Sequence, residues 1–384
     1  MTDNGSAGDN GSAGQKKSGL SGLIPIIHWL PQYQRTWLRG DLIAGLTVAA
    51  LVVPKSLGYA GIAGIPLQYG LYAAAAGAIL YALFGTSRQI ATGPSSALAA
   101  VAAGAVVAVS ASDKEALLMV ASITLISGLL FLLLAVFRMG WISQFLSKAV
   151  IVGFLFGAGL QVAISELSGI TGTETDGSNS WQEFGSWVGS LSNTDTTTLL
   201  VGVIALVVIF GLRFTYPKVP GALVLVVGGL LASALLDLGS EGVALVGNVP
   251  SGMPSVVLPD TGYIGDNVQA ILTAATALLL IGFSQTAGDA RAFASKHRYQ
   301  VDINQESVAQ GVANAGSGMV QGIPVSASLS ASSLNDETGA KTPLASLTTG
   351  AVVVLTMLFL APVFSDLPKP VLSALIIEAV VMGM

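Results

Sequence analysis

The sequence has no cysteine, only two histidines, and few charged residues of either sign. A chain without cysteine forms no disulfide, no thiolate metal site and no cysteine nucleophile. His28 and His297 lie far apart along the chain, which argues against a histidine-rich metal site. Charged residues make up 10% of the chain, against about 25% in soluble globular proteins. With 16 Lys+Arg against 21 Asp+Glu, there is also no basic stripe for nucleic acid. These absences exclude a soluble enzyme and a nucleic-acid-binding protein.

Apolar residues, in contrast, make up 52% of the chain. From residue 41 onward, apolar runs of about 17–25 residues alternate with short loops, and runs of this length can cross a bilayer as helices. The 46 glycines are typical of membrane helices whose backbones approach closely through small residues. We therefore predict an all-α polytopic membrane protein with spans at 41–60, 68–85, 93–110, 116–137, 146–165, 197–214, 219–237, 268–290, 303–320, 327–336, 342–362 and 370–384.

The residues before the first span differ from the rest of the chain. Residues 1–19 are of low complexity, with DNGSAG at 3–8 and again at 9–14, and are expected to form a disordered cytoplasmic tail. Residues 20–40 include an apolar stretch that is too short to span, so we expect an amphipathic segment at the membrane interface.

The distribution of Lys and Arg predicts the orientation, because cytoplasmic loops carry an excess of both. With the N-terminus placed in the cytoplasm, 13 of the 16 Lys+Arg fall on the inner side, and only Lys114 and Lys369 fall outside. The long loops at about 166–196 and 238–267 contain acids but no Lys or Arg, which suits the outer side. We expect a multi-pass protein of the plasma (inner) membrane.

An internal repeat relates the third and the tenth predicted spans. Each begins with a short extended piece that leads into a half-helix opening on small hydroxyl residues. Because seven spans separate them, the second copy is inverted relative to the first, as in many secondary transporters. We predict a first seven-span repeat at 41–237, an extracellular loop at 238–267, and a second repeat at 268–384.

The two half-helices predict an anion site. A helix N-terminus offers unpaired N–H groups and about half a positive charge, so two facing N-termini can hold an anion without a basic side chain. Ser95, Ser96, Ser328 and Ser330 would add hydroxyl donors. The alternative is that these serines only cap their helices.

Lys55 is the most informative charged residue. It lies about 14 residues into the first span, roughly 21 Å along a helix at 1.5 Å per residue, and a charge at such depth marks a functional candidate. The alternative is a lysine that reaches the outer interface because the span ends near Gly58. Tyr59 would line the same cavity or belong to an aromatic belt at the interface.

Three further polar residues lie within or beside predicted spans. Gln285, which can donate and accept, is either a site residue or a partner in an interhelical hydrogen bond. Glu378 lies deep in the last span and is a candidate proton carrier without an evident partner. Glu306 begins the ninth span, where an acid favours a helix N-terminus, and is interpreted as structural.

Several motifs resemble those of the SulP (sulfate permease) family, also called solute carrier family 26. They follow the family's order from about residue 37 to the end of the sequence: Val53-Pro54-Lys55-Ser56-Leu57-Gly58-Tyr59-Ala60, Gly70-Leu71-Tyr72, Phe84-Gly85-Thr86-Ser87-Arg88, Thr92-Gly93-Pro94-Ser95-Ser96-Ala97, Ala290-Arg291-Ala292-Phe293-Ala294, Asn304-Gln305-Glu306, Gly311-Val312-Ala313-Asn314 and Gly339-Ala340-Lys341-Thr342-Pro343.

The resemblance implies a fold of two inverted seven-span repeats in which a core domain carries the substrate and moves against a gate domain. It also implies homodimers and a cytoplasmic STAS domain after the last span. Because the sequence stops at Met384 inside an apolar run, we expect the last two spans and the STAS domain to be missing. The family's substrate contacts carry over to Lys55, Tyr59, Ser95, Ser96, Ala97, Gln285, Ser328, Leu329 and Ser330.

Three positions depart from the family pattern. Lys55 stands where the family usually has Gln, Gln285 where it usually has an acid, and Ala331 where animal members often have Arg. The acid that would hold a coupling ion in the eighth span is therefore absent, and the sequence leaves the coupling ion open between sodium and a proton.

The function predicted from these features is secondary active transport of a small inorganic or carboxylate anion, with sulfate first and bicarbonate or a dicarboxylate next. The alternatives are an anion channel built on the same site, or a truncated chain that is inactive by itself. A nucleobase carrier would need acids in the eighth and tenth spans. An enzyme is not expected, since no metal cluster or nucleophile–base pair is found, and no cofactor is predicted.

Overall fold

The computed structural model describes residues 24–109, 112–144, 148–176, 180–216 and 219–382. The predicted tail at 1–19 lies outside the described residues. Helices account for nearly all of the regular structure, and the one sheet among the described residues has two short strands.

Each predicted span coincides with a helix, which confirms the all-α fold. The helices of the first repeat are α3 (Leu38–Ile62), α4 (Gln68–Phe84), α5 (Ser96–Val109), α6 (Asp113–Val136), α7 (Lys148–Thr171), α9 (Thr196–Thr215) and α10 (Gly221–Leu236). Those of the second are α12 (Val268–His297), α13 (Ile303–Met319), α14 (Leu329–Glu337), α15 (Leu344–Leu355) and α16 (Lys369–Val381).

The short elements fill the connections. The segment before α3 forms α2 (Ile26–Trp29), η1 (Leu30–Gln32) and η2 (Arg35–Trp37), and α15 continues into the π-turn η5 (Thr356–Leu360) and η6 (Ala361–Asp366). The two long loops contain α8 (Ser180–Ser190) and α11 (Thr261–Asp266), which the hydropathy pattern did not predict, and η3 (Met139–Gln144) and η4 (Leu191–Asn193) complete the set.

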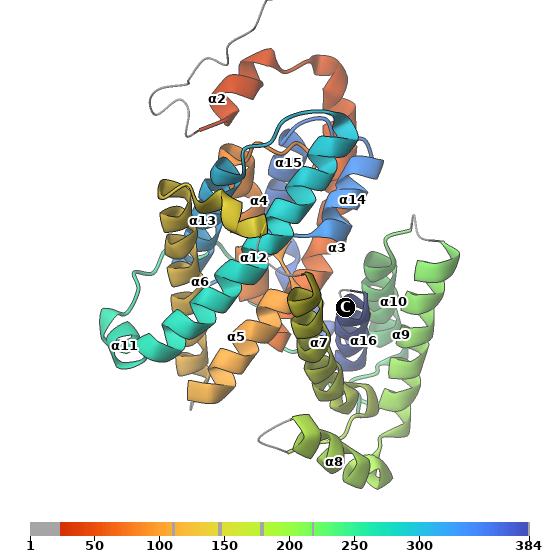
Figure 1. Ribbon diagram of the computed structural model, residues 1–384. Helices are drawn as coiled ribbons and strands as arrows, with labels where there is room; N and C mark the ends of the chain where they lie inside the picture. The colour runs from red at the N-terminus through yellow and green to blue at the C-terminus, as the bar shows by residue number, and fades with distance from the viewer. Residues whose placement is uncertain (1–23, 110–111, 145–147, 177–179, 217–218, 383–384) are drawn as a thin grey trace, which may run out of the picture.

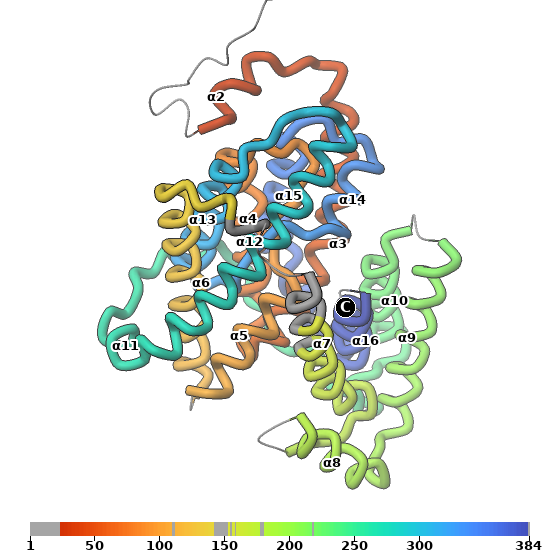
Figure 2. The backbone as a smooth tube through the Cα atoms, in the orientation of Figure 1, coloured from red at the N-terminus to blue at the C-terminus, as the bar shows by residue number. Residues whose placement is uncertain are grey.

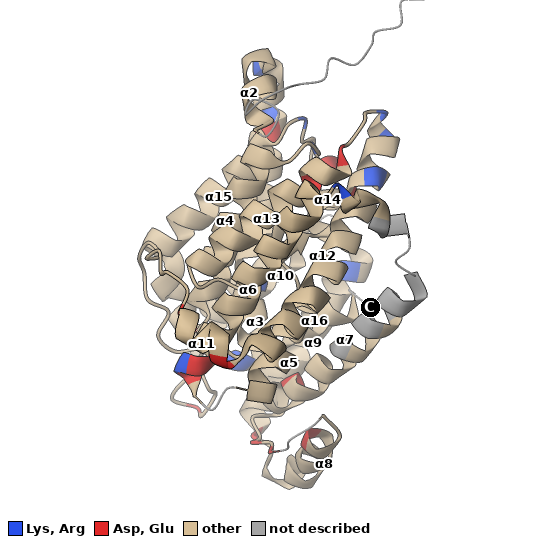
Figure 3. Ribbon diagram, turned by 60° about the vertical axis from the view of Figure 1, so that its left-hand side comes forward, with Lys and Arg blue, Asp and Glu red and all other residues tan. Residues whose placement is uncertain are grey.

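Five of the described helical segments are long and apolar enough to cross a membrane by themselves, judged by length and composition. They are Arg35–Ile62, Asp113–Val136, Thr196–Thr215, Val268–His297 and Leu344–Asp366. The shorter apolar helices α4, α5 and α10 pack among them. Most charged residues lie toward the two ends of the molecule, and the middle is largely free of them (Figure 3).

The helices pack into two groups, which are visible side by side in Figures 1 and 2. The large bundle contains α3, α4, α5, α6, α12, α13, α14 and α15; the small bundle contains α7, α9, α10 and α16, with α16 packed mainly on α7 and α9. The bundles meet where α3 contacts α10 and α16, and where α5 contacts α7.

Small residues allow the backbones to approach closely, as their abundance predicted. A Cβ atom on Gly70 of α4 would lie 1.9 Å from the Ser56 carbonyl oxygen of α3. A Cβ atom on Gly128 of α6 would lie 2.5 Å from the Ala315 nitrogen of α13. Gly58 of α3 lies between the two bundles, where its Cβ would lie 2.9 Å from the Ile376 side chain of α16.

Two extended segments far apart in sequence pair inside the large bundle. Strand β1 (Thr92–Pro94) and strand β2 (Val325–Ala327) are antiparallel, with Thr92 opposite Ala327 and Pro94 opposite Val325. Each strand leads directly into a half-helix, β1 into α5 and β2 into α14. This confirms the short extended segments predicted ahead of the third and tenth spans.

The ends of the bundles agree with the predicted loop arrangement. Helices α8 and α11, one from each long loop, lie toward the end of the molecule opposite α2 (Figure 1). Because both loops lie at one end of the molecule, they can lie on the same side of a membrane. The assignment of that end to the outer side of the membrane stays a prediction.

Candidate anion site

A cavity of about 700 Å³ lies at the junction of the two bundles. The large bundle contributes residues of α3, α5, α12 and α14 to its wall, and the small bundle contributes residues of α7, α9, α10 and α16. All nine residues predicted for the site line it: Lys55, Tyr59, Ser95, Ser96, Ala97, Gln285, Ser328, Leu329 and Ser330.

The β1–β2 pair places the two half-helix N-termini on opposite sides of this cavity. Because the strands are antiparallel, α5 leaves the pair at one end and α14 at the other. The three paired residues, with Ser95 and Ser328 beyond their two ends, separate the first residues of the two half-helices. Both positive helix ends therefore border the same cavity.

The serines at the helix starts cap the helices and also line the cavity. The Ser95 hydroxyl accepts a hydrogen bond from the Leu98 N–H at 3.4 Å, and the Ser328 hydroxyl accepts one from the Ala331 N–H at 3.5 Å. These caps use hydroxyl lone pairs, so the hydroxyl hydrogens can still donate. The capping and binding interpretations are therefore compatible.

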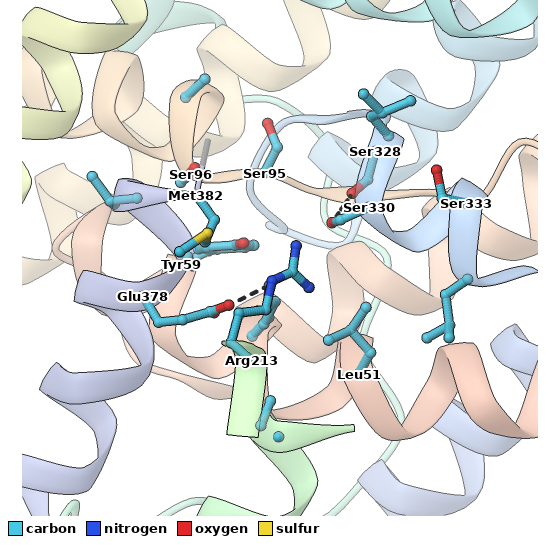
Figure 4. A pocket seen from close by; sticks show the side chains of 18 of the residues that line it. Leu51, Tyr59, Ser95, Ser96, Arg213, Ser328, Ser330, Ser333, Glu378 and Met382 are labelled. Atoms are coloured by element: carbon cyan, nitrogen blue, oxygen red, sulfur yellow. Dashed lines mark hydrogen bonds and ion pairs between the residues drawn. The ribbon is translucent and has the colours of Figure 1, made fainter. Parts of the chain in front are cut away.

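Ser330, in the first turn of α14, is exposed to the cavity. Its hydroxyl lies 3.3 Å from that of Ser328. Figure 4 shows Ser95 and Ser96 on one side of the space and Ser328 and Ser330 on the other. Tyr59 is almost fully buried, with 8% of its surface exposed, and its side chain closes the wall next to Glu378.

Lys55 has a carboxylate partner, which the sequence did not predict. Its Nζ atom lies 3.5 Å from Oε2 of Glu378 on α16. Only 14% of the Lys55 side chain and 5% of the Glu378 side chain are exposed. The idea that Lys55 reaches the outer interface is wrong, because the side chain points into the cavity and pairs with a buried acid.

Gln285 holds a strand in place as well as lining the cavity. Its Oε1 atom accepts a hydrogen bond from the Ser326 hydroxyl of β2 at 2.7 Å. The neighbouring Thr286 hydroxyl accepts one from the Ala327 N–H at 3.4 Å. The hydrogen bond of Gln285 therefore joins α12 to strand β2, and not to another helix as the interhelical alternative expected.

Three charged residues on the cavity wall were not predicted as site residues: Arg213, Asp289 and Glu337. Arg213 near the end of α9 points into the space in front of Glu378 (Figure 4), and Asp289 of α12 lies one turn beyond Gln285. Arg213 lies at the end of the span predicted at 197–214, and it was counted only among the 13 Lys+Arg of the inner side. Nothing in the spacing along the chain indicated that α9 borders the site.

The loop before β1 is held by a buried carboxylate. Glu306 of α13 accepts hydrogen bonds from the Thr86 N–H at 2.8 Å and the Ser87 N–H at 3.1 Å, and from the hydroxyls of Thr86 and Tyr81. Its side chain is 1% exposed. The prediction that Glu306 is structural fits this arrangement, although its role is to hold the loop that leads to β1.

The described residues contain no group of three or more His, Cys, Asp or Glu that could hold a metal ion. Residues 38–384 match the model of the sulfate permease family over nearly the whole chain. The chain belongs to this family. The family consists of membrane transporters and not enzymes, and the chain, with several helices long and apolar enough to cross a membrane, is a multi-pass membrane protein of this family.

Individual relatives agree with the family match. A probable sulfate transporter of Mycobacterium tuberculosis is 34% identical over 360 residues, which cover 94% of this chain and 64% of the relative. Human solute carrier family 26 member 6 is 31% identical over 385 residues, covering 92% of this chain and 50% of the relative. The chain thus spans half to about two thirds of the length of these relatives.

Two solved structures have the same fold. The structure of murine solute carrier 26 family member A9, in the inward-facing state, superposes with a TM-score of 0.83 at 26% identity, covering 96% of this chain and 64% of that chain. The transmembrane domain of a cyanobacterial bicarbonate transporter superposes with a TM-score of 0.82 at 23% identity, covering 91% of this chain and 90% of that chain. The inverted-repeat architecture predicted for the chain is therefore confirmed.

Proposed function

We propose that the chain is a secondary active transporter of a small anion, which it holds between the N-termini of α5 and α14. The observation that carries the proposal is the antiparallel β1–β2 pair, because it directs two positive helix ends into one cavity. The serine hydroxyls and Lys55 add donors on the same wall. This arrangement complements an anion with several acceptor oxygens.

Sulfate is the first substrate we propose, and bicarbonate or a dicarboxylate is the next. The Mycobacterium tuberculosis relative is named a probable sulfate transporter, and it is similar over 94% of this chain. These anions all present oxygen acceptors to N–H and O–H donors. They differ in charge, so the charge balance on the cavity wall will decide among them.

Alternating access is the mechanism that the two bundles support best. The half-helices belong to the large bundle, while Arg213 and Glu378 face them from the small bundle. A relative movement of the bundles would expose the anion to one side of the plasma membrane and then to the other. The homodimer and the cytoplasmic N-terminus stay predictions.

A backbone substitution tests whether the α14 N-terminus binds the anion. Leu329 is the first residue of α14, where proline keeps the helix but removes the N–H. Ser328 before it has φ −116° and ψ 112°, the extended conformation that a following proline requires. Leu329→Pro should weaken sulfate binding by about 10- to 150-fold, the equivalent of one charge-assisted hydrogen bond of about 1.5–3 kcal/mol.

Leu329→Ala is the matched control, since it shortens the side chain and keeps the N–H. Binding of labelled sulfate to the purified protein in detergent should be close to the original for Leu329→Ala and strongly weakened for Leu329→Pro. Equal affinities for the two variants would refute a contact at this N–H. In proteoliposomes, saturable uptake that trans-anion accelerates supports a transporter, and non-saturating flux supports a channel.

A further inference from the structure

Helix α8 presents an apolar face to the outside of the protein. Three of its large apolar side chains are exposed: Trp181 at 74%, Phe184 at 39% and Val188 at 49% of their surface. Their spacing of three and four residues places them on one side of the helix. An exposed apolar face of this kind marks a surface that contacts something other than water.

The other side of α8 is attached to the end of α7. The Trp187 Nε1–H donates a hydrogen bond to the Thr171 hydroxyl at 3.1 Å. The Ser186 hydroxyl accepts one from the Asp176 N–H, also at 3.1 Å. These contacts fix the rotation of α8 about its own axis, so the apolar face stays on the outside.

The place of α8 in the small bundle is level with a membrane surface. Residues 191–195 alone separate it from α9, whose 20 residues extend about 30 Å, the thickness of the hydrocarbon core. Only 22% of the most apolar stretch of α9 is buried within the protein, so most of that helix faces lipid. Helix α8 runs across the direction of α9 at the end where α9 begins (Figure 1). It therefore lies where the hydrocarbon core ends and the headgroups begin.

The partner that fits this face is the lipid surface. Exposed apolar side chains continue along the chain from Leu191 of η4 to Leu200 and Val207 of α9, on a membrane-spanning helix. Tryptophan is enriched at the boundary of headgroups and acyl chains, because its ring is apolar and its N–H is polar. Residues 166–196 contain no Lys or Arg and so offer anionic headgroups no basic partner. The contact therefore depends on apolar burial and not on lipid charge.

We propose that α8 is an interfacial anchor whose apolar face lies in the boundary between the headgroups and the acyl chains. Amphipathic helices at this boundary bury their apolar side chains by about 5–10 Å. Because α8 is attached to α7, the anchor acts on the small bundle and sets its depth in the membrane. This lipid contact is separate from the anion site and does not depend on which anion is carried.

Single-cysteine variants measure the depth of each face, because the chain has no native cysteine. Val188→Cys carries a nitroxide label on the apolar face. Gly189→Cys is the matched control, since the next position points about 100° away around the helix and its Cβ would have no atom within 4 Å. The labelled full chain is placed in nanodiscs of phosphatidylcholine. Electron paramagnetic resonance power saturation then compares collisions with oxygen, which concentrates in lipid, and with a nickel chelate, which stays in water.

The two labels should report different depths. We expect the Val188→Cys label about 5–10 Å below the headgroup boundary, and the Gly189→Cys label at the headgroups or in water. Adding phosphatidylglycerol should leave both depths unchanged, because α8 has no basic side chain. Equal depths for the two labels, or free access of the nickel chelate to the Val188→Cys label, would overturn the anchor.

A second copy of the chain on this face would give a different result. The Val188→Cys label would then be shielded from oxygen and nickel alike, and spin–spin broadening would disappear on dilution with unlabelled protein; this outcome also overturns the proposal. If Val188→Cys does not reconstitute, Trp181→Cys offers an exposed position on the same face. No anion is needed for the measurement, so its result stands apart from that of the sulfate-binding test.

Discussion

The two strands that lead to the half-helices are held in place by different parts of the chain. The residues before and within β1 are bound by side chains of the second repeat: Glu306 holds Thr86 and Ser87, Ser332 holds the Ala91 N–H, and Gln310 holds the Thr92 hydroxyl. Strand β2 is bound by residues of its own repeat, on α12 and α13.

The inverted repeat is therefore symmetric in its backbone, but the side chains that hold its two strands are not equivalent. Asn314 of α13 both donates to the Val325 carbonyl at 2.8 Å and accepts from the Val325 N–H at 3.0 Å. No described residue of the first repeat provides β1 with an equivalent pair of hydrogen bonds. The second repeat therefore supplies the polar framework for both halves of the site.

The largest expected effect follows removal of the carboxylate before β1. Glu306→Ala leaves the buried Ser87 N–H, the partly buried Thr86 N–H and two hydroxyls without their acceptor. Since hydrogen bonds to charged groups contribute about 1.5–3 kcal/mol each, we expect a loss of at least about 3 kcal/mol of stability. A thermal scan of the purified protein by size-exclusion chromatography measures this as a much lower apparent melting temperature.

Tyr81→Phe is the control for Glu306→Ala, because it removes one of the donors and leaves the carboxylate in place. Its melting temperature should fall much less. If both variants melt alike, Glu306 does not organise the loop before β1.

A smaller effect is expected on the side of β2. Asn314→Ala leaves the N–H and the carbonyl of Val325 unpaired in a buried position, which should cost about 2–3 kcal/mol. Asn335→Ala is the matched change near β1, because the Asn335 amide donates only to the Gln89 carbonyl at 2.9 Å. The same thermal assay should rank Asn314→Ala as the more destabilised of the two, and the reverse order would contradict the proposed framework.

The smallest effect is expected for Ser326→Ala. The Ser326 hydroxyl donates to Gln285, whose side chain borders the cavity, so water can replace the lost donor. Stability should change by less than about 1 kcal/mol. A collapse comparable to that of Asn314→Ala would show that β2 depends on α12 as strongly as on α13.

Much of the fold follows from the sequence, because hydropathy and charge act locally along the chain. The twelve spans, the Gly-rich packing and the Ser-capped half-helices each depend on a short window of residues. The partner of Lys55 could not be found in this way, since Glu378 lies in the last helix and no spacing rule relates α3 to α16. Arg213 was missed for the same reason, because hydropathy does not specify which helices become neighbours.

The pairing of β1 with β2 also has a consequence for biosynthesis. The loop at 85–94 is inserted with the first repeat, but the residues that bind it lie more than 200 positions later in the chain. At a synthesis rate of about 5–20 residues per second, the ribosome reaches them only after roughly 10–45 s. Until then, the polar groups of that loop lack their native hydrogen-bond partners. A premature stop after the first repeat would therefore leave a product that cells should recognise as unfinished.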